Sequence, residues 1–194
     1  MSVVFEGDKR ELRSLYGKMK RLQERDKPLV DNGFYHSIQW LGNLVTRLGG
    51  NWQEVTCRGI WDNLNYRNGC LSFCTETAWQ PPFSLLKFIK KKYPSLSFYF
   101  EAEGDGWDNY LTNDAEGRHY SSRYIVDCEP DIEYFDSIEE ACSHLAEYIG
   151  KTITPSWTSL QEAAELWNEE HDDADWPINV KLIEVIGNDE IWDC

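Results

Sequence analysis

The chain has 194 residues, a length that suits one domain or one compact core with a small appendage. Hydrophobic residues make up 41% of it and aromatic residues 14%, which excludes a disordered chain because so many rings need a packed interior. No apolar run approaches the roughly 18 residues of a membrane span, and residues 1–8 show no secretion signal. We therefore expect a globular, cytoplasmic protein with no membrane partner.

The formal net charge is −15, and it is unevenly distributed along the chain. Residues 1–100 carry fifteen Lys and Arg against nine Asp and Glu, whereas residues 101–194 carry four against twenty-five. A negative field of this size repels phosphate and attracts basic surfaces, so direct nucleic-acid binding is disfavoured. Two interpretations stay open: a solvated acidic surface that aids solubility, or a binding surface for a basic partner.

The hydrophobic pattern of the first fifty residues is mainly helical. A short strand is predicted over 3–5. Asp8 and Glu11 form a capping box at the start of a predicted helix over 8–25. Apolar residues at helical spacing predict a second helix over 33–48.

The pattern then changes to strands. Alternating residues predict strands over 55–61, 70–77 and 96–103. Turn residues at 63–69 join the first two of these strands into a hairpin. Pro81 and Pro82 open a predicted helix that stops at Pro94.

The last third of the chain mixes strands and helices. The predicted strands are 110–112, 118–128 and 178–186. Capping boxes begin one helix at Ser137 and another at Thr158. Because strands and helices alternate without an internal repeat or a flexible linker, the sequence predicts one α+β domain with the helices mainly on one face of its sheet.

The six cysteines, at positions 57, 70, 74, 128, 142 and 194, include no Cys-x-x-Cys pair. Their spacing fits neither a disulfide framework nor an iron–sulfur cluster, so we expect no such cluster and no other cofactor. The acidic run 169–175 lacks the ligand spacing of an EF-hand loop, and His144 with Glu147 forms only half of a carboxylate-bridged metal motif. We therefore predict no metal site.

The residues that could carry chemistry do not form a recognised catalytic motif. The chain has no Gly-x-Ser-x-Gly elbow, and its four histidines are too scattered to nominate a general base. A carboxylate, a Trp and a helix start do fall together in 75–82. Trp79 could serve as a binding platform or simply fill the core under the helix start. Glu76 could bind a ligand or pair with Arg58 or Arg123. We predict no catalytic residue and name six candidate binding residues: Arg58, Glu76, Trp79, Glu101, Trp107 and Arg123.

The same segment carries a family resemblance. Thr77-Ala78-Trp79-Gln80-Pro81-Pro82, followed by Tyr93-Pro94, resembles the YubB ferredoxin-like family of bacterial plasmids, phages and conjugative elements. In that family a strand ending in T-A-W-x-P-P enters a helix that stops at Y-P. The resemblance covers about residues 50–105 and extends more weakly to about 130.

The resemblance implies a ferredoxin-like antiparallel or mixed sheet, a name for topology and not for a cluster, and it transfers no catalytic residue. Applied to the whole chain, it gives a single domain over 1–194, in which a helical extension, 1–50, packs on a ferredoxin-like core, 51–194. The extra N-terminal and C-terminal helices depart from the family pattern.

Four functional hypotheses follow. The leading one is an accessory protein of a mobile element, more a binding protein than an enzyme, that contacts a basic protein through residues 101–194. The alternatives are a nucleic-acid mimic that inhibits a host DNA-processing or defence protein, and an enzyme with a pocket near Arg58, Glu76 and Trp79. The fourth is nucleic-acid binding by basic residues of the first half: Arg21, Arg25, Lys27, Lys87, Lys90, Lys91 and Lys92.

Overall fold

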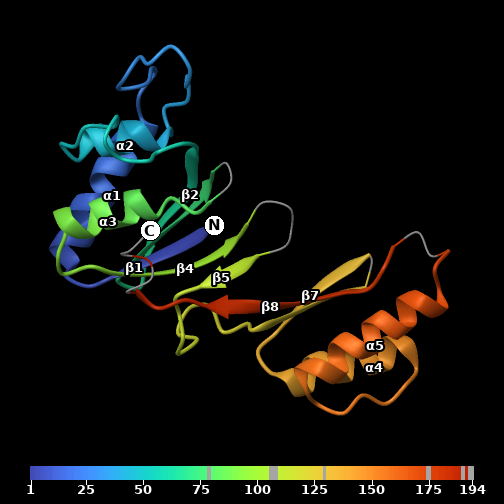
Figure 1. The fold of residues 1–194 in the computed structure, drawn as a ribbon. Coiled ribbons are helices and arrows are strands. Elements are labelled where there is room, and N and C mark those ends of the chain that lie inside the picture. The colour runs from blue at the N-terminus through green and yellow to red at the C-terminus, as the bar shows by residue number, and fades with distance from the viewer. Residues whose placement is uncertain (78–79, 105–108, 129, 174–175, 189–190, 192–194) are drawn as a thin grey trace.

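The computed structural model describes residues 1–77, 80–104, 109–128, 130–173, 176–188 and 191 (Figure 1). In this part of the chain the elements are β1 (Ser2–Glu6), α1 (Lys9–Gln23), α2 (Leu41–Arg47), β2 (Ile60–Arg67), β3 (Cys70–Glu76), α3 (Phe83–Lys92), β4 (Ser97–Glu103), β5 (Tyr110–Thr112), β6 (Tyr124–Cys128), β7 (Asp131–Phe135), α4 (Ile138–Ile149), α5 (Trp157–Glu170) and β8 (Asn179–Val185).

The described strands form one eight-stranded sheet in the order β2-β3-β1-β4-β5-β8-β6-β7. Neighbouring strands pair antiparallel, except that β5 and β8 run parallel. The prediction of an α+β chain with an antiparallel or mixed sheet is thus confirmed. The sheet is larger than a ferredoxin-like one, because four strands from the second half continue it beyond β4.

The strand registers show that the described helices cover one face of the sheet. Ala102 belongs to the first apolar core and lies opposite Leu111, which in turn lies opposite Glu184. Side chains alternate along a strand, so Leu182 shares that face, and its partner Tyr124 packs on the second apolar core. The two cores therefore lie on the same side, and the opposite side is free of helices.

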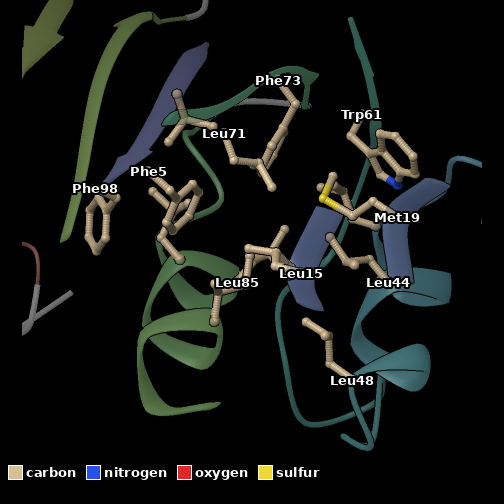
Figure 2. Close-up of a cluster of buried hydrophobic side chains, with 14 of the residues drawn as sticks. Phe5, Leu15, Met19, Leu44, Leu48, Trp61, Leu71, Phe73, Leu85 and Phe98 are labelled. Atoms are coloured by element: carbon tan, nitrogen blue, oxygen red, sulfur yellow. The ribbon is translucent and has the colours of Figure 1, made fainter. Parts of the chain in front are cut away.

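The first core packs α1, α2 and α3 against β1 to β4. Figure 2 shows Phe5 and Phe73 from the strands pointing toward Leu15 and Leu85 from the helices. Apolar residues of α1 recur at helical spacing, which buries one stripe of that helix. A second core packs α4 and α5 against β6 and β8, and a smaller cluster of Tyr110, Ile125 and Ile183 lies on the helix-free face.

The predicted helix over 33–48 is wrong over its first half, since α2 begins only at Leu41. The side-chain oxygen of Asn32 accepts the backbone N–H groups of Phe34 and Tyr35 at 2.9 and 2.8 Å, a local turn that competes with helix formation. Phe34 is 85% exposed, so the apolar pattern that suggested a helix does not mark a buried face here.

The predicted hairpin is misplaced by several residues. β2 spans 60–67, and the turn consists only of Asn68 and Gly69, whose φ angles are +52° and +81°. Two positive φ angles are what a type I′ turn requires, and Asn-Gly is its strongest sequence signal. The earlier part of the predicted strand, 55–59, is irregular.

Three differences affect the second half. Residues 118–123 form no strand, β7 is a strand that was not predicted, and the N-cap of α5 lies two residues before the predicted cap at Thr158. The hydroxyl of Ser156 accepts the backbone N–H of Ser159 at 3.1 Å and is the true N-cap. The predicted helix from Ser137 and the predicted strand over 178–186 are confirmed.

Replacing Phe5 with Ala should lower the free energy of unfolding by about 3–5 kcal/mol, because the ring is fully buried between the sheet and α1 to α3. The matched change Phe34→Ala should alter it by less than about 0.5 kcal/mol, since that ring is exposed. Urea denaturation followed by tryptophan fluorescence measures both. Equal losses would contradict the assignment of the core.

Candidate functional site

Of the six predicted binding residues, two lie outside the described part of the chain and two others do not come together. Trp79 and Trp107 lie outside the described residues. Arg58 is exposed in the coil before β2, and Glu76 is exposed at the end of β3. Where the structure is described, no hydrogen bond or ion pair joins Arg58 to Glu76.

The other two, Glu101 and Arg123, interact electrostatically on the helix-free face but form no ion pair with each other. Glu101 lies on β4, in register with Ser2 of β1 and Thr112 of β5. Burial raises the pKa of the Glu101 carboxyl, and the positive charges of Arg123 and the amino terminus offset only part of that rise. The structure therefore holds a partly buried carboxylate close to two cationic groups.

Arg123 also has a structural role, which the sequence did not reveal. Its guanidinium donates hydrogen bonds to the backbone carbonyls of Asp114, Ala115, Tyr120 and Ser122 at 2.6–3.4 Å. All four carbonyls belong to the loop 113–123, which we call the covering loop. Arg123 thus fixes this loop from its C-terminal end.

The covering loop lies over the helix-free side of β1 and β4. The Arg118 guanidinium donates to Glu6 Oε2 at 3.1 Å, and His119 Nε2 lies 3.1 Å from Glu6 Oε1. Both side chains also contact the ring of Tyr99. Burial would raise the pKa of Glu6, but Arg118 and His119 outweigh it and hold that pKa below its ordinary value.

Two further contacts fix the same loop. The carboxylate of Asp114, which is almost fully buried, accepts the backbone N–H groups of His119 and Tyr120 at 2.6 and 3.0 Å. The Tyr120 hydroxyl donates to Ser2 Oγ at 3.0 Å, and burial raises the pKa of Tyr120 to about 12. No sequence signal could reveal these contacts, because Ser2 and Tyr120 are 118 positions apart.

One hollow, of about 190 Å³, lies at the start of β4. Its lining residues are Lys90, Ser97, Phe98, Tyr99 and Asn188, none of which is among the six predicted. The Lys90 ammonium already donates to the carbonyls of Pro94 and Leu96 at 2.8 and 2.6 Å. This hollow therefore does not present a free cation to a ligand.

The described cysteines are free thiols, and those in the cores are poorly reactive. Burial raises the pKa of Cys57 and of Cys128 to about 11, far above the pKa of a reactive cysteine. Among the residues that the structure describes, no group of three His, Cys, Asp or Glu side chains could hold a metal ion.

A second candidate site is the acidic pair of helices in the C-terminal half. α4 and α5 lie side by side and run in the same direction (Figure 1). At their C-terminal ends Tyr148 contacts Trp167, and the Lys151 ammonium donates to Glu170 Oε2 at 2.7 Å. Both helices therefore direct the negative ends of their dipoles to one place.

The solvent side of α5 carries a stripe of carboxylates. Glu162, Glu165, Leu166 and Glu169 are exposed, and their spacing of three and four residues places them along one face. Leu166, in the middle, is 55% exposed. We call these four residues the α5 acidic face. Glutamates at this spacing repel one another.

The carboxylates in the last turn of α5, Glu169 and Glu170, also oppose the dipole of that helix. Cations at the C-terminus of a helix are favourable and anions are not. α1 and α3 follow this rule, with Lys or Arg in their last turns, whereas α5 ends in Glu169 and Glu170 and has no basic residue there. Lys151 lowers the pKa of Glu170, but among the described residues no ion pair is formed by Glu162, Glu165 or Glu169.

Comparison with protein-family models, curated proteins and solved structures finds no match to this chain. None of the helices in the described ranges has the length and apolar character needed to cross a membrane.

Replacing Glu101 with Gln should stabilise the protein at pH 7, because a group whose folded-state pKa is raised destabilises the fold while it is charged. The gain should disappear as the pH falls below the ordinary range of a Glu carboxyl, where the native residue is itself protonated. Urea unfolding at pH 7 and pH 4 measures it. Glu103→Gln, an exposed change on the same strand, is the control and should show no such gain. A loss of stability on Glu101→Gln at pH 7 would mean that attraction to Arg123 outweighs burial.

Proposed function

We propose that this protein binds a basic protein partner through the α5 acidic face and the carboxylates at the end of that helix. The single observation that supports the proposal most is the row of exposed carboxylates along α5, which ends with Glu169 and Glu170 at the negative end of the helix dipole. A basic segment bound there would remove the repulsion. The free chain has few positive side chains that could offset this repulsion, since Lys151 and Lys181 are the only Lys or Arg residues in 124–194.

Exposed apolar side chains in the same half would supply contact energy. Leu166 lies within the acidic face, Tyr148 of α4 contacts Trp167 of α5, and Trp176 follows α5. Carboxylates give fast encounter and orientation, whereas buried aromatic and aliphatic groups provide most of the affinity at an interface.

We also propose that residues 2–103 form a ferredoxin-like unit, in place of the core expected over 51–194, because β1 lies between β3 and β4 in the sheet. Support comes from the chain order β1-α1-α2-β2-β3-α3-β4 and the strand order β2-β3-β1-β4, which match the β-α-β-β-α-β arrangement of such a unit with α2 added. Membership of the YubB family, and with it an accessory role on a mobile element, rests only on the sequence resemblance of about residues 50–105.

Nucleic-acid mimicry is a second candidate, and one specific observation favours it. Carboxylates three or four residues apart on a helix have Cβ atoms roughly 5–6 Å apart, a separation comparable to that of phosphates along one strand. A mimic must compete with duplex DNA for its partner. Partner binding that excess duplex DNA leaves unchanged would contradict mimicry and leave the binding proposal intact.

The test compares two variants that each remove three negative charges. The first is Glu162→Gln, Glu165→Gln and Glu169→Gln on the α5 acidic face. The second, as a control, is Glu24→Gln, Asp26→Asn and Glu54→Gln in the basic half, where all three side chains are exposed. The probe is a fluorescein-labelled peptide of ten lysines, followed by fluorescence anisotropy.

The α5 variant should weaken binding of this peptide by about tenfold at low salt, and the control by less than about threefold. Both variants change the net charge equally. A difference in peptide affinity between them therefore shows that the position of the carboxylates matters. Equal weakening would contradict the proposal, because it would show attraction by overall charge alone.

A further inference from the structure

The sheet has two outer strands, β2 and β7, and among the described residues only β2 is covered by another part of the chain. Coil residues cover the start of β2: the Trp61 N–H donates to Gln39 O at 3.0 Å, and Trp40 forms an isolated bridge with Ile60. The register of β2 also shifts between Asp62 and Asn65. Coverage and irregularity of this kind are how natural proteins block an edge.

β7 has neither protection. It pairs with β6 in unbroken register over its five residues, from Cys128↔Asp131 to Tyr124↔Phe135. In the described part of the chain, no strand or coil pairs with its outer side. β7 therefore presents a straight, open row of backbone donors and acceptors.

The side chains of β7 divide by chemistry between the two faces. Ile132 and Tyr134 lie on the helix-free face and are 39% and 46% exposed. Asp131 and Glu133 lie on the helix side, beside α4, whose His144 contacts the ring of Phe135. A strand added to this edge would therefore meet carboxylates on one side and apolar groups on the other.

We propose that β7 is a docking edge for an extended segment of the partner in which basic and apolar residues alternate. The inference rests on the proposed function for the positive charge of that partner. The backbone of the segment would pair with the open edge, its basic residues would face Asp131 and Glu133, and its apolar residues would face Ile132 and Tyr134. Charge complementarity thus selects this occupant.

The same carboxylates argue against a second copy of this chain at the edge. Two β7 strands paired with each other would place Asp131 and Glu133 of both copies side by side, and like charges across a strand pair are destabilising. An inward or edge charge commonly protects against self-pairing. Here the same carboxylates favour pairing with a basic segment.

The experiment uses the whole protein and a synthetic peptide, Lys-Val-Lys-Ile-Lys-Val-Lys, with anisotropy and amide hydrogen exchange as readouts. Two peptide controls separate strand pairing from charge: the same residues in the order Lys-Lys-Lys-Lys-Val-Ile-Val, and the alternating peptide with N-methyl groups on alternate backbone nitrogens. The protein variants are Glu133→Lys on β7 and Glu24→Lys in the other half. Both are exposed and change the net charge equally.

The alternating peptide should bind at least about tenfold tighter than either peptide control, and should slow exchange of amides in 131–135. Glu133→Lys should weaken it by about tenfold, and Glu24→Lys by less than about threefold. Equal binding of all three peptides, unchanged exchange in β7, or equal effects of the two variants would overturn the docking edge. None of these outcomes bears on the α5 variants, so the proposed function fails or stands separately.

Discussion

The parallel pairing of β5 with β8 is the contact on which the arrangement of the molecule depends. It is short, joining Tyr110, Leu111 and Thr112 to Ile183, Glu184 and Val185, yet it joins the strands β1 to β5 to the strands β8, β6 and β7 in one sheet. The Ile186 N–H donates to Thr112 O at 2.8 Å and extends the pairing by one bond. Because this pairing keeps the side-chain alternation in phase, both sets of helices cover the same face, and the opposite face is left to the covering loop.

The two halves of the chain belong to one sheet but differ in charge. In the first half, the basic residues at the ends of α1 and α3 suit the helix dipoles, so local electrostatics favour the helices that the fold contains. In the second half, α5 ends in carboxylates that oppose its dipole and repel each other. Conflicts of this kind between local preference and fold are rare in natural proteins except where function requires them. That is why the α5 acidic face, and not the partly buried Glu101, supports the proposed function.

Periodicity was sufficient where a helix buries one continuous stripe. It predicted α1, α3 and α4 because apolar residues recur every three or four positions and caps or prolines mark the ends. It failed over 33–40, where Phe34 continues the apolar pattern without being buried. It also misplaced the β2–β3 hairpin. Residues 55–59 alternate like a strand but are irregular, whereas the Asn68-Gly69 pair marks the actual turn.

The sites were less predictable than the elements. Glu101 and Arg123 are candidates from the sequence and do interact electrostatically, but the four carbonyls that Arg123 holds could not be predicted. The contacts of Glu6 with Arg118 and His119 join positions more than a hundred residues apart, and only the folded sheet brings them together. The negative charge of the second half was evident in the sequence. That several of these carboxylates lie along one side of α5 could be recognised only once the bounds of that helix were known.

The most direct test of the account is the stability of the free protein with the α5 acidic face neutralised, measured as the midpoint of urea unfolding at about 20 mM and about 1 M NaCl. If the carboxylates oppose the fold, the triple glutamine variant unfolds at higher urea than the native chain at low salt, and the difference shrinks at high salt. A variant that is equally or less stable at low salt would show that these carboxylates impose no electrostatic penalty, and the argument for a basic partner at α5 would fail.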